Sequence, residues 1–79
     1  MRAVIHDADI RGVEKGTGRC GDYLIVRFED ETGKPCDVCD KDMSREPYYK
    51  KGTIGDIYIN IESGKNFTSV RVVDFKIKN

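Results

Sequence analysis

The chain has 79 residues, of which 38% are hydrophobic and 35% charged, and this composition is typical of one small globular domain. Its 14 basic and 14 acidic residues cancel, which excludes a strongly basic nucleic-acid-binding domain. No apolar run reaches the roughly 18 residues of a membrane helix, and the first residues lack a secretory signal pattern. We expect one cytoplasmic domain over residues 1–79, with no membrane partner.

The first half of the chain predicts three strands, because its apolar residues recur with period two. The first strand is expected over 3–11, and it places His6 on the apolar face as a core or edge residue. Residues 12–22 hold four glycines and predict a flexible loop or a long twisted hairpin. The second strand, 23–29, alternates cleanly between inward and outward positions, and a tight turn at 30–34 leads to a third strand over 35–41.

The second half predicts one connection and a closing hairpin. Pro47 limits any helix within 42–52 to a turn. A fourth strand over 53–62 directs its isoleucines inward, and a turn at 63–66 leads to a fifth strand over 67–78. The apolar phase of that strand shifts by one at Val73, which indicates a β-bulge. Five strands in this order predict an all-β, OB-fold-like small barrel with the glycine-rich hairpin as a wing, and an SH3-like barrel is the alternative.

The three cysteines, Cys20, Cys36 and Cys39, form an odd set that favours a reducing compartment. Together with His6 they could furnish a zinc site. However, Cys36 and Cys39 are three residues apart on a predicted strand, so their side chains point to opposite faces. We therefore expect three small hydrophobic residues, no bound metal and no cofactor.

The charges are unevenly distributed along the chain. Residues 29–42 contain six acidic and two basic residues, whereas residues 11–28, 43–52 and 63–79 each carry an excess of basic residues. If folding brings these three segments together, the protein has a positive face and a negative back. The alternative is scattered, solvated charge that keeps a small domain soluble.

Several tyrosines lie close to basic residues in the predicted elements. Binding of single strands without sequence preference requires aromatic faces on which bases stack and cations that follow the backbone. The alternative is that outward tyrosines cover a thin barrel or form a dimer contact. The pattern comprises Tyr23, Arg27, Tyr48, Tyr49, Lys50, Lys51 and Tyr58.

Two segments together resemble a known family. The first is the glycine-rich basic segment 11–19, which ends a few residues before Tyr23. The second is the run Pro47-Tyr48-Tyr49-Lys50-Lys51-Gly52, followed by a strand, the turn segment 63–69 with Phe67, and a long final strand. This order resembles the small single-stranded-DNA-binding, helix-destabilising proteins of filamentous phages, which are OB-fold dimers with a DNA-binding wing.

The resemblance implies roles for particular residues. It places Arg11, Lys15 and Arg19 of the wing near phosphates, and Tyr23 and Phe67 at base-stacking positions. The last strand would add basic residues. The chain departs from the family pattern at residues 20–22 and at Asp74. The further basic candidates are Lys65, Arg71 and Lys76.

The function that we expect from the sequence is binding without catalysis. The chain would coat and protect single-stranded DNA, or RNA, as a homodimer in the replication of a phage, plasmid or mobile element. No enzyme is expected, because the chain has no nucleophile or paired-acid signature and little interior for a catalytic pocket. No small-molecule substrate is expected either. The alternative is a small β-barrel adaptor that docks a protein partner.

Overall fold

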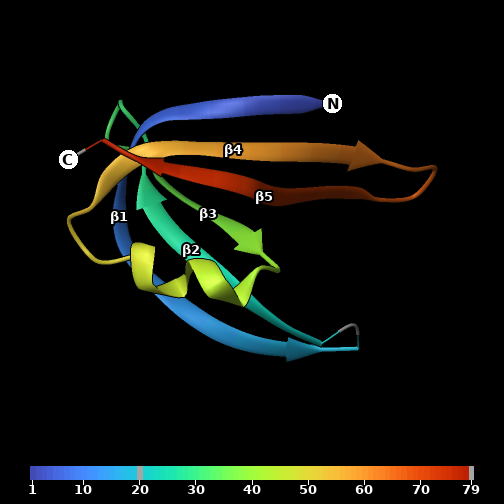
Figure 1. Ribbon diagram of the computed structural model, residues 1–79. Coiled ribbons are helices and arrows are strands. Elements are labelled where there is room, and N and C mark those ends of the chain that lie inside the picture. The colour runs from blue at the N-terminus through green and yellow to red at the C-terminus, as the bar shows by residue number, and fades with distance from the viewer. Residues whose placement is uncertain (20, 79) are drawn as a thin grey trace.

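The protein is a closed five-stranded barrel in the computed structural model, which describes residues 1–19 and 21–78. Its elements are β1 (Arg2–Gly18), β2 (Gly21–Glu29), β3 (Pro35–Asp40), the short 3₁₀ helix η1 (Met43–Tyr48), β4 (Ile54–Ser63) and β5 (Thr68–Ile77). The strands close in the order β1-β2-β3-β5-β4, with β3 and β5 parallel and the other neighbours antiparallel (Figure 1). The OB-like barrel with a hairpin wing is confirmed.

The first strand is longer than the sequence predicts. The first part of β1 pairs with β4 and its second part pairs with β2 as far as the Gly18–Gly21 pair. The glycine-rich segment is therefore the hairpin, and it is not a flexible loop. The sequence does not predict a strand in this segment, because glycine is depleted from strands and weakens them. We call residues 15–24 the wing.

The side-chain phase predicted for the start of β1 is wrong. His6 is exposed, with 58% of its side-chain surface accessible, and its Nδ1 lies 3.4 Å from Asp56 Oδ1. The cause is a register shift against β4 between Ile5 and Ala8, where Asp7 has a φ of 55°. Ile5 packs against the core before the shift and Ala8 after it, so His6 falls outside the apolar phase.

The turn at 30–34 is confirmed and has a side-chain cap. Asp30 Oδ1 accepts hydrogen bonds from the backbone N–H groups of Thr32 and Lys34, at 2.9 and 3.0 Å. Gly33 adopts a φ of 83°, which glycine reaches at low cost. The Thr32 hydroxyl and then the Lys34 N–H lower the pKa of Asp30.

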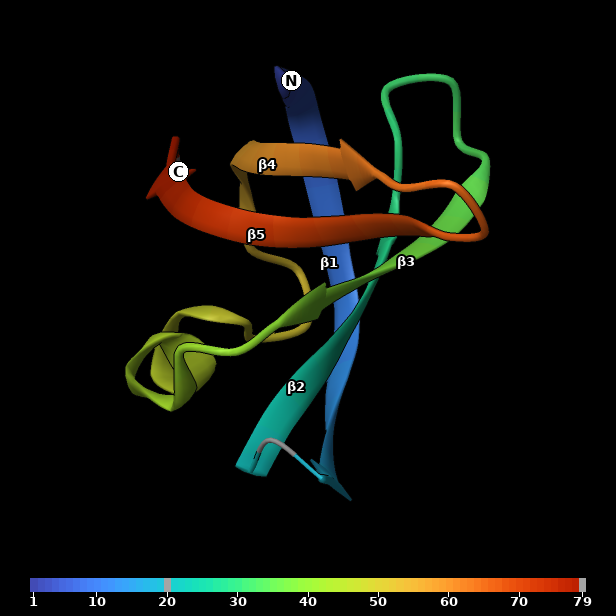
Figure 2. The ribbon, with the colours of Figure 1, turned by 90° about the vertical axis from the view of Figure 1, so that its right-hand side faces the viewer.

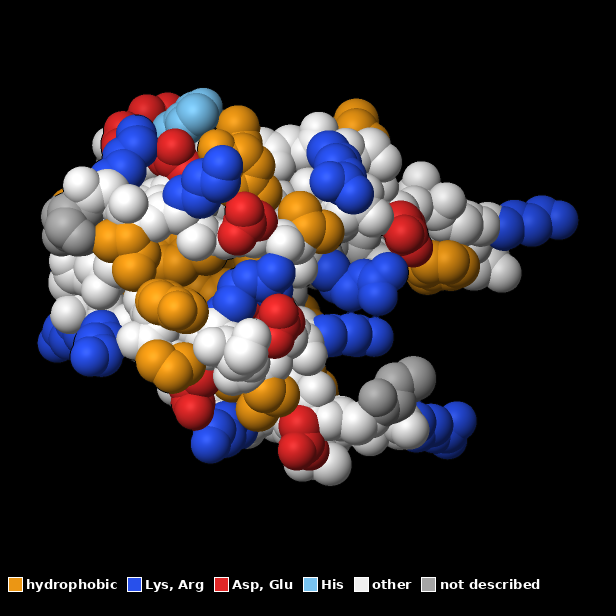
Figure 3. Space-filling model, in the orientation of Figure 1, with side chains coloured by type: hydrophobic (Ala, Val, Ile, Leu, Met, Phe, Trp, Pro, Cys, Tyr) orange, Lys and Arg blue, Asp and Glu red, His pale blue; other side chains and the backbone are white. Residues whose placement is uncertain are grey.

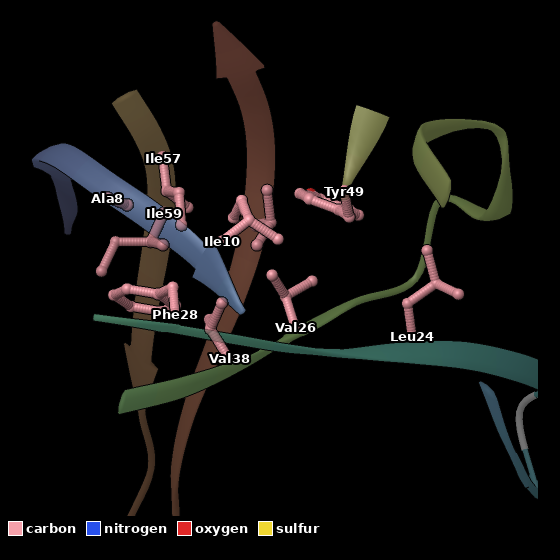
Figure 4. Close-up of a cluster of buried hydrophobic side chains, with 10 residues drawn as sticks. Ala8, Ile10, Leu24, Val26, Phe28, Val38, Tyr49, Ile57 and Ile59 are labelled. Atoms are coloured by element: carbon pink, nitrogen blue, oxygen red, sulfur yellow. The ribbon is translucent and has the colours of Figure 1, made fainter. Parts of the chain in front are cut away.

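The core lies inside the barrel and follows the predicted alternation of β2 and β4. Figure 4 shows these side chains converging from several strands. No helix among residues 1–19 and 21–78 is long and apolar enough to cross a membrane. The buried hydrophobic residues are Ala8, Ile10, Leu24, Val26, Phe28, Val38, Tyr49, Ile57, Ile59 and Val72.

The bulge predicted in β5 is confirmed at Val73. Ile59 lies opposite Val72, whereas the preceding Tyr58 lies opposite Asp74, so Val73 is the extra residue. The core contribution of β5 nevertheless begins at Val72, which is 6% exposed, and not at Val73 as the sequence predicts. At the far end of the strand, Ile77 is 44% exposed, although it still lies opposite Gly55 of β4.

Candidate nucleic-acid interface

Two hairpins project from the same end of the barrel and leave a gap between them (Figure 1). One is the wing, and the other is the turn region of β4 and β5, residues 62–69, which we call the second hairpin. Figure 2 looks from the side of the hairpin tips and shows the wing below, β4 and β5 above, and β2 and β3 between them. The outer face of β2 and β3 is thus the surface between the hairpins.

This surface is hollowed at two adjoining places, which together we call the cleft. The hollow beside the wing, of about 300 Å³, is lined by Arg19, Tyr23, Cys39 and Lys41 among others. The second hollow, of about 350 Å³, includes Arg71 at the crossing of β3 and β5. Lys41 lines both hollows. The fold therefore brings Arg19, Tyr23 and Arg71, which are far apart in sequence, to one cleft.

The position of Tyr23 depends on a glycine of the wing. Tyr23 lies opposite Gly16 in the β1–β2 ladder. Its ring lies so close to the Gly16 backbone that a Cβ there would come within 2.5 Å of the ring. A glycine at this position lets the aromatic ring lie across the neighbouring strand, and the ring also lines the hollow beside the wing.

The second hairpin carries an exposed aromatic ring. Phe67 is 63% exposed, as its place in a polar turn predicts, and its ring packs over Gly64. The Gly64 N–H donates a hydrogen bond to the Phe67 carbonyl oxygen at 2.8 Å, which closes the turn. Lys65 lies at the same tip. Each hairpin therefore presents one aromatic side chain and at least one cation.

Arg45 lines the cleft and is paired with Asp40, whereas the exposed cations of the cleft and of the second hairpin have few acidic partners. Among residues 1–19 and 21–78, Arg19, Lys41 and Lys65 make no ion pair, and Arg71 makes a long one of 3.4 Å to Glu62. Figure 3 shows Lys and Arg side chains around the notch between the two hairpins. Asp22 and Asp42 also line the cleft, so it carries charges of both signs, with the cations Arg19, Lys41, Arg45 and Arg71 in the majority.

A buried ionic network fixes the floor of the cleft. Asp40 is fully buried at the end of β3. Its carboxylate accepts hydrogen bonds from Arg45 Nη1 at 2.8 Å, the Tyr49 hydroxyl at 2.5 Å and the Asp42 N–H at 2.9 Å. Arg45 Nη2 also donates to the carbonyl oxygen of Val73 at 2.5 Å. The network therefore ties η1 to both β3 and the β5 bulge.

Tyr49 belongs to this network, and the surface position that the sequence predicts for it is wrong. Its side chain is only 2% exposed and packs with the aliphatic core (Figure 4). Burial, and then the Asp40 carboxylate, raise the pKa of the Tyr49 phenol, so the hydroxyl remains a donor. Tyr48, Lys50 and Lys51 are exposed but do not line the cleft.

Several basic residues expected at the site are engaged elsewhere. Lys15 extends from the wing to Glu46 of η1, with 3.3 Å between Nζ and Oε1. Arg27 pairs with Glu14, which raises the pKa of the guanidinium. Arg11 lies at the register shift of β1, and its Nε is 3.4 Å from Glu29 Oε2. These three residues lie outside the cleft.

Tyr58 and Lys76 form a separate pair on the outer face of β4 and β5. The ammonium of Lys76 lies over the Tyr58 ring, 5.3 Å from its centroid. Arg2 lines the same hollow. Arg2 and Lys41 were not predicted as site residues, because Lys41 belongs to an acidic stretch and Arg2 lies at the start of the chain.

The two described cysteines lie on opposite faces of β3. Cys36 packs against the core, whereas Cys39 lines the cleft. This agrees with the expectation from their spacing, which argues against a shared metal. The expectation for Cys20 lies outside the described residues.

No protein-family model matches the chain, and neither a curated protein nor a solved structure matches it significantly. Of the features that the resemblance to the phage proteins implies, the structure shows the small five-stranded β-barrel.

Proposed function

We propose that the protein binds single-stranded DNA in the cleft, without sequence preference and without catalysis. The observation that carries this proposal is the convergence of Tyr23 and Arg19 of the wing with Lys41 after β3 and Arg71 of β5 on one hollowed face. Stacking on aromatic rings and attraction of phosphates to cations are the two interactions that such binding needs.

The cleft offers these interactions in a suitable arrangement. Tyr23 and Phe67 would each support a base from opposite hairpins, while Lys41 and Arg71 on the floor would meet the phosphates between them. Glu62 lies beside Arg71, at 3.4 Å and half exposed, so a phosphate competes with a weak surface pair. The coating of single-stranded intermediates, by a homodimer, is the role that we propose for this binding.

The test is a titration with oligo(dT), followed by tyrosine fluorescence and repeated at several salt concentrations. Stacking on Tyr23 is expected to quench the fluorescence, and log K is expected to fall linearly with log salt, by about 0.7 per phosphate contact. A matched oligo(U) series separates DNA from RNA preference. Absence of any binding at low salt would overturn the proposal.

Phe67→Ala is expected to weaken oligo(dT) binding by about 1–3 kcal/mol, the range for one lost stacking platform. The melting temperature should hardly change, because the ring is 63% exposed and contributes little to the core. Thermal unfolding monitored by circular dichroism checks the second statement. A loss of stability of ~3–5 kcal/mol, as for a buried phenylalanine, would contradict it.

A protein-binding adaptor is the second candidate function, and the exposed apolar residues of the second hairpin favour it. Phe67 of this hairpin is 63% exposed, and Val70, which follows it in β5, is 38% exposed. An adaptor would use this surface for a protein partner and would ignore the oligonucleotide. The same titration therefore separates the two candidates.

A further inference from the structure

A third hollow, of about 350 Å³, lies on the outer face of β4 and β5 beside the start of β1. We call it the outer hollow. Tyr58, Val73 and Lys76 line it together with Arg2 of β1. It lies where the bulge at Val73 interrupts the register between β4 and β5. An aromatic ring, an apolar floor and two cations therefore occupy one hollow.

The outer hollow adjoins the cleft. Val73 lines both of them, just as Lys41 lines both hollows of the cleft. The sheet register agrees, because Arg2 lies opposite Asn60 and Asn60 opposite Arg71. Arg71 in turn pairs with Cys39 of β3. Since directly opposite residues share one face, a row of side chains runs from the cleft across β5 and β4 to β1.

Positive charge follows this row. In the part of the chain that the structure describes, Arg2 and Lys76 make no ion pair, and the Lys76 ammonium lies over the Tyr58 ring. The acidic residue of the hollow, Asp74, accepts a hydrogen bond from the Phe75 N–H at 2.8 Å. Figure 3 shows Lys and Arg side chains over β4 and β5 as well as around the notch.

We propose that a bound single strand continues from the cleft over β5 into the outer hollow. There Tyr58 stacks on one further base, and Arg2 and Lys76 contact phosphates. Lys76 covers the Tyr58 ring in the free protein, so the incoming base displaces its ammonium toward the backbone of the strand. This inference rests on the proposed function, because it extends the same site to a longer stretch of nucleic acid.

The test compares two variants over a length series from (dT)4 to (dT)16. Tyr58→Leu is expected to weaken binding of the long oligonucleotides roughly 5- to 100-fold, which corresponds to one lost stacking platform. Arg2→Ala is expected to flatten their salt dependence by about 0.7 in log K against log salt. Neither variant should affect the shortest oligonucleotides that bind, because these fill only the cleft.

The Arg2→Ala variant also separates a loss of binding from a loss of folding, because Arg2 is exposed whereas Tyr58 is half-buried. The control is Lys34→Ala, which removes one exposed charge from the turn between β2 and β3 and should behave like the wild type at every length. Equal losses at all lengths, or no loss at any length, would overturn the extension. Failure of the wild-type protein to bind any length would overturn the proposed function itself.

Discussion

Asp40→Ala is expected to lower the free energy of unfolding by about 3–5 kcal/mol, the range for removing one partner of a buried ion pair. Asp40 is fully buried and accepts hydrogen bonds from Arg45, Tyr49 and the Asp42 N–H. Without the carboxylate, the buried Tyr49 hydroxyl loses its acceptor, and Arg45, whose side chain is only 19% exposed, loses its buried counter-ion. A domain of this size has only ~3–5 kcal/mol of net stability, so the variant should be largely unfolded at room temperature.

Urea unfolding followed by circular dichroism measures this loss. Tyr49→Phe provides a graded variant, since it keeps the ion pair and removes one hydrogen bond to a charged group, at a cost of about 1.5–3 kcal/mol. The matched control is Asp37→Ala, an exposed carboxylate on the same strand, with an expected effect within about 0.5 kcal/mol. If Asp40→Ala were as stable as Asp37→Ala, the network would not be what holds η1 against the barrel.

The strands with one buried face could be predicted from the sequence. In β2 and β4, inward apolar residues alternate with outward residues that, apart from Ile25, are mainly polar or aromatic, and a slip of one residue would expose the whole inward set. Leu24, Val26 and Phe28 are buried for this reason, and so are Ile57 and Ile59. The bulge of β5 could also be predicted, because the shift in the alternation of apolar residues can be read directly from the sequence.

The start of β1 could not be predicted because its irregularity has no such signature. The register shift falls between Ile5 and Ala8, and the residue with positive φ is Asp7. Aspartate adopts this conformation more readily than most residues, yet it is common in regular strands and turns alike. Nothing in the local pattern therefore reveals that His6 leaves the apolar face.

The buried network was missed for a different reason. Asp40 lies within an acidic stretch that looks solvated, and its partners Arg45 and Tyr49 are five and nine residues further along. Only the path of η1 brings them together. The same path separates the adjacent Tyr48 and Tyr49, so that one ring is exposed and the other buried. Proximity of tyrosine to lysine in the sequence therefore says little about a shared surface.

Lys41 is the clearest case of a site residue that depends on the tertiary structure. It follows Asp40 at the end of β3, and because Asp40 faces inward, Lys41 faces the cleft between Tyr23 and Arg71. In the sequence its charge is offset by the adjacent acids, of which Asp40 lies in the buried network and Asp42 lines the same hollow and caps η1. The cleft thus gains a cation from the segment that the sequence marks as negative.

The triple variant Arg19→Ala, Lys41→Ala, Arg71→Ala is expected to lose most of the affinity of the cleft for single strands. Three lost phosphate contacts flatten log K against log salt by about 2, and at 50 mM salt they reduce affinity by roughly 10²- to 10³-fold. Oligo(dT) titrations at four salt concentrations measure both quantities. Stability should change little, because none of the three side chains is part of the core.

The matched control for this experiment is Lys34→Ala, Lys50→Ala, Lys51→Ala, which removes the same charge from exposed residues outside the cleft. If binding depended on net charge alone, both triple variants would lose the same affinity for oligo(dT). If the strand binds in the cleft, only the first variant loses affinity. A control variant that loses as much affinity and as much salt dependence would show that binding follows the overall charge. In that case the cations around Lys41 would have no special role.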